Sequence, residues 1–573
     1  MLRFASVGAA LTLLSGIALA APDTPTTAYG ALVDGYFKDR FAANPIEATD
    51  TGVHDYDAKL PDLTEAAHLA RRKALRDWLG KAAAIDPAGL PEMSRDDLAF
   101  LISTIKGQLL ADEQVALWRK DPNLYLVLAT DSVFGLIKRD FAPAADRLKS
   151  ATSRERQIPV LLATAKANLT QTAPIYVDIA LEQIDGTISF FKNDAPGAFA
   201  GVADKALQAE FATANQGVIA ALGEYKAFLQ QLRPKATGAF AIGRAAFQEK
   251  LLDEDMVDLP VDKILEVGMT QLRKDQAALA EAARRIDPGK SADAVLAQVE
   301  SDHVAADRLI PTARDQLTML RRFVIDRKIV TVPGEEQPIV TETPPFARAT
   351  TFASMDAPAA LETHARESYY YITLPDPTWP AAKQEEYLRG YNTPLLQNVS
   401  VHEVWPGHFV QHLYDEADKN RSLVRRVLSA NTTVEGWAHY TEQMMLDEGL
   451  GNGDPRLRMM QAIDALLRDC RLVVGIRIHT TGMSLADARK FFVEEGHQQP
   501  VVGEMEVKRG TEDPTYLYYA LGKLAILKLR ADYRAKMGDR FSLLDFHDRF
   551  NRAGVIPLKL IRRELMGADG PLL

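Results

Sequence analysis

The stretch NVSVHEVWPGHFVQHLYDEADKN, from Asn398 to Asn420, places His402 and His408 six residues apart. Many zinc peptidases carry two histidines four residues apart on one helix face, with a glutamate directly after the first as general base. On a regular helix, residues six apart differ by about 120° in azimuth, so such a pair cannot share a metal ion. The stretch therefore predicts either a metal site on a distorted helix or an ordinary helix that carries three histidines.

A proline and a glycine favour the distorted helix. Pro406 lies four residues after His402, has no N–H to donate to the His402 carbonyl, and crowds that carbonyl with its ring. Gly407 tolerates the backbone that results. We expect a bulge or a partly unwound turn over Trp405 to Gly407, which brings His408 back to the face of His402.

A second helix is predicted in the segment TTVEGWAHYTEQMMLDEG, where Glu435, His439 and Glu442 follow each other at i, i+4 and i+7 on one face. Catalytic zinc usually has three protein ligands and one position for water. We therefore predict Glu435 as the third ligand beside His402 and His408. His439 and Glu442 are predicted to orient the ligands from behind.

Spacing and composition leave two alternatives open. His-Glu pairs occur by chance in acidic helical proteins, so these residues need not bind a metal at all. His408 and His412 are four residues apart and could form a metal pair on an unbroken helix.

The composition of the 573 residues, 47% hydrophobic and 25% charged, is that of a folded protein, and the net charge of -10 argues against a nucleic-acid partner. Apolar residues at three- and four-residue spacing predict helices almost throughout. Val, Ile, Thr and Tyr between Pro and Gly predict short strands at about 328–376. We predict an N-terminal helical region, 21–300, and a catalytic region, 301–573, with the strands beside the metal-site helices.

The first twenty residues, MLRFASVGAALTLLSGIALA, have a lone Arg3, an apolar run and small residues at Ala18 and Ala20. They predict a signal peptide cleaved after Ala20, and hence a periplasmic or secreted protein. No later segment reaches about 18 apolar residues, so no stable membrane insertion is expected. Cys470 is the single cysteine and allows no intramolecular disulfide.

Further residues suit hydrolysis at such a site. Glu403 is the predicted general base. Tyr516, Tyr518 and Tyr519 are candidate donors to a developing oxyanion, with core packing as the alternative for each. Tyr519 is preferred as the catalytic donor, and Tyr516 is assigned to substrate binding. Arg509 precedes these tyrosines and is preferred as the cation for a peptide carboxylate. The other candidate cations are Arg477 and Arg366.

Two more features concern how a substrate is held. His479 could line the cleft, with a hydrogen-bonded structural role as the alternative. The segment ESYYYITLP is the preferred edge for an extended peptide, with an internal strand as the alternative. The remaining histidines have no acidic or histidine partner at ligand spacing and are predicted to be structural: His54, His68, His303, His364, His497 and His547.

The segments HEVWPGHFVQ, EGWAHYTEQMMLDEG and RGTEDPTYLYYALGKLAILKLR resemble the bacterial domain of unknown function 885 family, whose members are similar to zinc metallopeptidases of the gluzincin type. The resemblance covers nearly the whole mature chain. It implies a gluzincin-like, predominantly α-helical fold with a small β element beside the active-site helices. It also implies zinc at His402, His408 and Glu435, Glu403 as base, and Tyr519 in a Tyr-x-x-Gly element.

One residue departs from the family pattern. His439 stands where the resemblance implies an apolar residue, so its role as a fourth ligand stays open. The expected function is an exported zinc-dependent peptidase that hydrolyses peptides. The alternatives are a periplasmic metal-binding protein without turnover, and a zinc hydrolase of non-peptide amides or esters.

Overall fold

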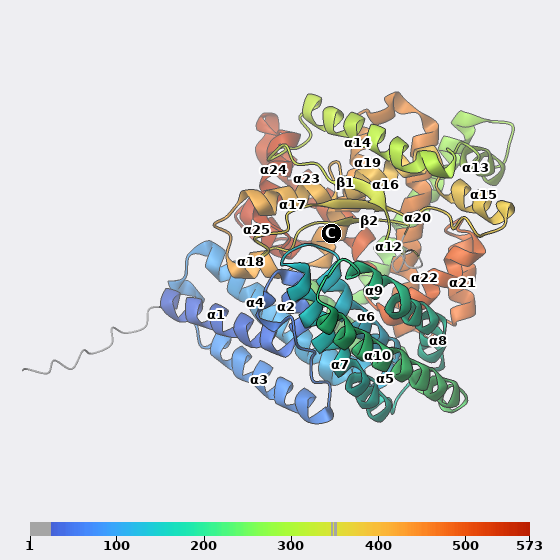
Figure 1. Ribbon diagram of the computed structural model, residues 1–573. Helices are drawn as coiled ribbons and strands as arrows, with labels where there is room; N and C mark the ends of the chain where they lie inside the picture. Colours follow the sequence, from blue (N-terminus) through green and yellow to red (C-terminus); the bar gives the residue numbers. More distant parts are fainter. Residues whose placement is uncertain (1–24, 345–347, 349–351) are drawn as a thin grey trace, which may run out of the picture.

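The computed structural model describes residues 25–344, 348 and 352–573, and the predicted signal peptide lies outside them. These residues fold predominantly into α-helices around one small sheet of three strands (Figure 1). This confirms the predicted helical fold class with a small β element. Among the described helices, none combines the length and the hydrophobicity needed to cross a bilayer.

The described residues among the first 300 form thirteen α-helices, of which α1 to α10 pack side by side in the lower half of Figure 1. They are α1 (Pro25–Ala43), α2 (Pro45–Thr51), α3 (Glu65–Ala83), α4 (Glu92–Leu110), α5 (Leu117–Lys120), α6 (Asn123–Ile137), α7 (Ala144–Asn168), α8 (Pro174–Ser189), α9 (Ala195–Ala198), α10 (Lys205–Leu232), α11 (Arg244–Asp255), α12 (Val261–Ile286) and α13 (Ala292–Glu300).

The remaining helices surround the sheet. They are α14 (Leu309–Asp326), α15 (Ala381–Gly390), α16 (Thr393–Glu403), α17 (His408–Ala417), α18 (Leu423–Val427), α19 (Asn431–Asp447), α20 (Pro455–Thr480), α21 (Leu485–Glu494), α22 (Pro500–Glu512), α23 (Tyr518–Met537), α24 (Leu543–Ala553) and α25 (Leu558–Met566). Ser484 caps α21 by accepting a hydrogen bond from the Asp487 N–H, as the sequence Ser-Leu-Ala-Asp predicts.

The predicted boundary near residue 300 does not separate two hydrophobic cores. One core joins Phe37 of α1 and Leu101 of α4 to Leu320 of α14. Another packs Leu272 of α12 against Leu466 of α20. Long amphipathic helices must bury an apolar face, and here helices from both predicted regions bury it against each other. Helices α6, α7, α8 and α10 share a core of their own.

The sheet consists of β1 (Ile339–Glu342), β2 (Ala353–Asp356) and β3 (Tyr369–Ile372), in the order β1-β3-β2. β3 pairs parallel with β1 and antiparallel with β2, and Tyr370 faces Val340 on one side and Met355 on the other. The segment ESYYYITLP is thus the central strand, and its preferred reading as an edge is wrong. Tyr370 and Ile372 on one face are buried, Tyr369 and Tyr371 on the other are half-buried, and a strand lies on each side of β3, as in an internal position.

His402 and His408 lie on two separate helices, α16 and α17. Asn392 caps α16, and the helix ends at Glu403 instead of continuing through a bulge. A new helix, α17, begins at His408 after a link that contains a cis Trp405–Pro406 bond. The link is held by two hydrogen bonds, from the Gly407 N–H to the Val401 carbonyl at 3.0 Å and from the Trp437 indole to the Pro406 carbonyl at 2.8 Å.

Helices α19 and α23 cross in close contact, with Gly436 and Gly522 at the crossing point. A Cβ on Gly436 would lie 2.6 Å from the Gly522 Cα, and a Cβ on Gly522 would lie 2.0 Å from the Thr432 carbonyl oxygen. Larger residues at either position would push the helices apart. The crossing places the first turn of α23, with Tyr519, next to the part of α19 that carries Glu435.

We expect Gly407→Ala to destabilise the protein by about 1–3 kcal/mol and to disturb the predicted metal site, lowering its zinc affinity by about 10-fold or more. The reason is that a Cβ at this position would lie 1.6 Å from the His402 carbonyl oxygen, so the link between α16 and α17 must move. Thermal unfolding and zinc titration measure the two effects. Gly390→Ala is the matched control, because a Cβ there meets no atom within 4 Å. Equal behaviour of the two variants would show that the tight link does not hold the histidines in place.

Candidate metal site

The site is built from the end of α16, the start of α17 and the first half of α19. His402, His408 and Glu435 each offer a ligand atom, and these atoms lie within 4.8 Å of one another. In the described part of the chain, this is the group of His, Cys, Asp and Glu side chains whose ligand atoms converge in this way. The break between α16 and α17 therefore brings together two histidines that a straight helix would hold apart.

The distances suit a tetrahedral ion. The Nε2 atoms of His402 and His408 each lie 3.5 Å from the Glu435 Oε2. Two ligand atoms about 2.1 Å from one zinc ion, at the tetrahedral angle, are about 3.4 Å apart. A separation of 3.5 Å is also at the limit for a hydrogen bond, so these pairs are better explained as ligands that face a common centre.

The Glu435 carboxylate supplies an independent test of fit. Its Oε2 is buried and has no hydrogen-bond partner among the described residues. A buried carboxylate oxygen without a partner is costly, and a cation at the common centre would satisfy it. Two imidazoles and one carboxylate are donors that zinc prefers, so the residues fit this ion.

In the absence of a metal ion, the negative charge of Glu435 and the positive charge of His402 stabilise each other. Burial works against an ionised Glu435, but the neighbouring His408 and His402 outweigh it and hold the pKa of Glu435 well below its usual value. Burial likewise opposes a charged His402, but Glu435 and Glu442 raise the pKa of His402 to about 10. A metal ion would take the place of the His402 proton, because a histidine ligand must be deprotonated.

Glu442 lies behind His402 and contacts His439 as well. Its Oε1 accepts a hydrogen bond from His402 Nδ1 at 2.7 Å, and its Oε2 accepts one from His439 Nδ1 at 3.0 Å. Burial opposes its charge, but the nearby His439 and His402 hold the pKa of Glu442 well below its usual value. The carboxylate can only accept, so His402 carries a proton on Nδ1, and loss of the Nε2 proton would leave the Nε2 lone pair free for a metal ion.

His439 and His412 do not join the three ligands. His439 is fully buried and turned toward Glu442, and burial and the Lys523 charge lower its pKa to about 4. His412 lies one turn beyond His408 on α17 and packs on the Phe409 ring. The structure therefore assembles neither His439 as a fourth ligand nor the rival pair of His408 and His412.

Glu403 is the last residue of α16 and faces the sheet. Its Oε2 accepts a hydrogen bond from the Met355 N–H of β2 at 2.9 Å. The side chain is partly exposed and is not one of the converging ligand atoms. β3 is tied to the same helix by a hydrogen bond of 3.2 Å between the Tyr370 and Ser400 hydroxyls. The β2 contact with Glu403 joins residues distant in sequence, and no local pattern indicates it.

Tyr519 lies beside the ligands, with its ring centroid 6.5 Å from that of His402. Its hydroxyl accepts a hydrogen bond from Arg509 Nη2 at 3.1 Å. The Tyr518 hydroxyl donates to Asp513 at 2.8 Å. Two of the residues chosen from the sequence, Tyr519 and Arg509, are thus in contact with each other at the site.

The other predicted substrate-binding residues lie elsewhere. Tyr516 is fully buried, with its ring against Gly475 and Gly510, and cannot meet a substrate. His479 is buried between two backbone bonds, with its Nε2 2.8 Å from the Gly510 carbonyl and its Nδ1 3.4 Å from the Ile242 N–H. Burial lowers the pKa of His479 to about 4, so it is a neutral structural residue. Both assignments to substrate binding are therefore corrected.

The other two candidate cations, Arg366 and Arg477, contact residues other than Tyr519. Arg366 is exposed and pairs with Glu416 at 3.0 Å. Arg477 contacts the Met269 sulfur at 3.8 Å.

Most histidines predicted to be structural have hydrogen-bond partners far along the chain, which sequence spacing did not reveal. These contacts are His54 with Glu362, His68 with Asp112, His303 with Glu385, His497 with Asp293, and His547 with Tyr440 and the Ile329 carbonyl. His54 also contacts Asp57, an acidic residue three positions away that the sequence itself shows.

Two arginines of α20 were missed. Arg471 lies with its Cζ 4.9 Å from the Tyr519 ring centroid, and Arg468 lies at 5.7 Å. Both interrupt the apolar stretch ALLRDCRLVVGI, and a charge in an otherwise buried helix is a signal of a specific partner. Their position in this apolar stretch could have identified Arg468 and Arg471 as candidate site residues.

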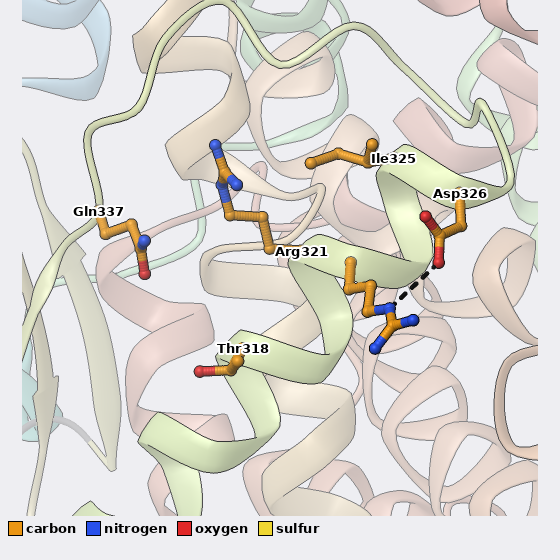
Figure 2. A pocket seen from close by; sticks show the side chains of 6 residues that line it. Thr318, Arg321, Ile325, Asp326 and Gln337 are labelled. Carbon is orange, nitrogen blue, oxygen red and sulfur yellow. Dashed lines mark hydrogen bonds and ion pairs between the residues drawn. The ribbon is translucent and has the colours of Figure 1, made fainter.

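A separate cavity of about 310 Å³ lies along α14 (Figure 2). Figure 2 shows Arg321 and Gln337 projecting toward it, and a hydrogen bond of 3.3 Å joins Arg322 to Asp326. None of the candidate metal ligands lines this cavity. It is therefore distinct from the metal site.

Comparison with known proteins places the chain in a family. Residues 45–565 match the family described as "Bacterial protein of unknown function (DUF885)". The chain belongs to this family. The search of curated proteins gives no match for this DUF885 chain.

Two solved structures are similar to this DUF885 protein. One is described as "a putative lipoprotein of unknown function from Shewanella oneidensis", with 26% sequence identity, a TM-score of 0.80, and coverage of 94% of this chain and 100% of that one. The other is a "putative lipoprotein from Colwellia psychrerythraea", with 17% identity, a TM-score of 0.81, and coverage of 95% and 99%. The second likeness concerns the fold alone.

Proposed function

We propose that this DUF885 protein is an exported zinc-dependent peptidase of gluzincin-like architecture. The observation that carries the proposal is the distance of 3.5 Å from the Glu435 Oε2 to the Nε2 atoms of both His402 and His408. Three protein ligands leave one position of a four-coordinate ion for water or substrate, as in catalytic zinc sites. The predicted leader over residues 1–20 supports a periplasmic or secreted location.

Zinc bound to these residues would polarise the scissile carbonyl and lower the pKa of water. Glu403 accepts the proton of the attacking water and passes it to the leaving amine. The hydrogen bond from the Met355 N–H keeps one carboxylate oxygen of Glu403 in place, and Glu442 fixes the tautomer of His402. Tyr519 donates its O–H to the oxyanion that develops on the carbonyl.

β2 is the strand that we propose for holding an extended peptide. It is an edge strand of the three-stranded sheet, and its Met355 N–H points away from β3 toward Glu403. The outer edge of β2 thus faces the proposed base. A peptide along this edge would bring its scissile bond close to Glu403 and would expose alternate side chains to pockets.

The proposal is tested by metal analysis of the purified full chain and by digestion of a peptide library read by mass spectrometry. We expect about one zinc per chain, as in mononuclear sites, and peptide cleavage that stops on chelation and returns with added zinc. His408→Ala should lose both zinc and cleavage, whereas the matched variant His412→Ala on the same helix should keep both. Bound zinc without hydrolysis of any peptide would favour the metal-binding protein, and hydrolysis of esters or other amides alone would favour the non-peptide hydrolase.

A further inference from the structure

Three guanidinium groups surround the ring of Tyr519. The Cζ atoms of Arg471, Arg509 and Arg468 lie 4.9, 5.6 and 5.7 Å from the ring centroid. The arginines come from α20 and α22, and Tyr519 comes from α23. Positive charges this close repel each other in a partly buried site, so each needs an anionic partner.

Two of the three cations have such a partner in the protein. Arg471 forms two parallel hydrogen bonds with Glu506, at 2.6 and 2.7 Å. Arg468 pairs with Asp464, one turn earlier on α20. These two charges are therefore neutralised within the fold.

Arg509 has no carboxylate within ion-pair distance among the described residues. Its Nη2 contacts only the hydroxyl oxygens of Tyr518, at 3.4 Å, and Tyr519, at 3.1 Å. The side chain is partly exposed, so a ligand can reach it. One positive charge beside the site is thus left for a ligand, and the planar guanidinium is suited to a carboxylate.

Arg509 lies a short distance from the place proposed for the scissile bond. Tyr519 lies between His402 and Arg509, because its ring centroid is 6.5 Å from that of His402 and its hydroxyl accepts a hydrogen bond from Arg509. An extended peptide advances about 3.3–3.6 Å per residue. Between a carbonyl at the metal ligands and a carboxylate at Arg509 there is therefore room for only a few residues.

We propose that Arg509 binds the C-terminal α-carboxylate of a peptide, so that the protein acts as a carboxypeptidase that removes a short C-terminal fragment. The proposal rests on the zinc-peptidase function above and adds its substrate class. The C-terminal carboxylate is favoured over an acidic side chain because its distance from the scissile bond is set by the backbone alone.

The reaction is a simple hydrolysis. The C–N bond of the scissile amide breaks and a C–O bond to the water oxygen forms. One water proton goes through Glu403 to the leaving amine, and the other is released with the new carboxylate. The fragment that leaves carries the α-carboxylate held by Arg509.

The first experiment compares one library peptide as the free acid, as its C-terminal amide, and as the amide with an added internal glutamate. Binding to the metal-free full chain is measured by fluorescence anisotropy, and cleavage by the zinc-loaded chain is measured by mass spectrometry. We expect the free acid to bind and to be cleaved about 10- to 100-fold better than the amide, and near its C-terminus only.

The second experiment uses Arg509→Met, with Arg477→Met as the matched control and unfolding temperature as a check of the fold. Arg509→Met should raise KM for the free acid by about 10- to 100-fold and leave the amide unchanged, because the amide never engages the cation. Arg509→Lys should restore part of the preference. The control should behave as the unaltered protein does.

Other outcomes would overturn the proposal. Equal cleavage of free acid and amide, or cuts at internal bonds far from the end, would exclude a C-terminal anchor. An equal loss on both peptides in Arg509→Met would show that Arg509 only positions Tyr519. Preference for the internal glutamate would assign the cation to an acidic side chain. If the zinc-loaded chain cleaves no peptide, the peptidase function itself fails, and the anisotropy comparison alone decides whether Arg509 binds a C-terminal carboxylate.

Discussion

Under the proposed function, we expect replacement of Glu403 by glutamine to lower peptide turnover by about 10²- to 10⁴-fold and to leave the zinc content unchanged. Glutamine keeps the size of the side chain and can still accept the hydrogen bond from the Met355 N–H, which measures 2.9 Å in the structure. It cannot take a proton from water. Zinc is retained because Glu403 is not among the converging ligand atoms. The measurement is kcat on a peptide that the unaltered protein cleaves, with zinc determined in the same sample.

Glu416→Gln is the matched control for this change. Glu416 lies on α17 and pairs with Arg366 and Lys419 at the surface, so its replacement should alter neither turnover nor zinc. Full activity of the Glu403→Gln protein at equal zinc content would refute the general base and return the metal-binding protein to first place.

Replacing Glu435 by glutamine is expected to weaken the proposed zinc binding instead. A neutral amide takes the place of the only anionic ligand, so the affinity should fall by more than the factor of about 10 to 100 that is typical of changes behind the ligands. Activity falls with it and returns only at high zinc concentration. The measurements are calorimetric zinc titration and the rise in unfolding temperature on adding zinc, which corresponds to about 2.7 kcal/mol at 100 times Kd for an intact site.

Glu442→Gln provides the graded comparison for Glu435→Gln. It removes the negative charge and leaves one acceptor oxygen for the two N–H groups of His402 and His439, while all three candidate ligands remain, so zinc affinity should fall by about 10- to 100-fold. If Glu435→Gln bound zinc as tightly as the unaltered protein, the third ligand would have to be another residue.

The helical class and the small β region follow from the sequence alone, and so does the choice of His402, His408 and Glu435 as candidate ligands. These follow from local rules. Apolar residues at helical spacing set the helices, Pro406 and Gly407 interrupt one of them, and the i, i+7 relation of Glu435 and Glu442 puts both on one face of α19. Each rule acts within a few residues of chain, so it can be read without knowledge of the fold.

Only the tertiary structure decided which of the candidates meet. The end of α16 at Glu403, the contact of Glu403 with β2, and the place of β3 at the centre of the sheet depend on packing between distant segments. The same packing buries Tyr516 and His479 and gathers Arg468 and Arg471 around Tyr519. A side chain of given type can serve in a core or in a site, and only the neighbours that the fold brings to it distinguish the two.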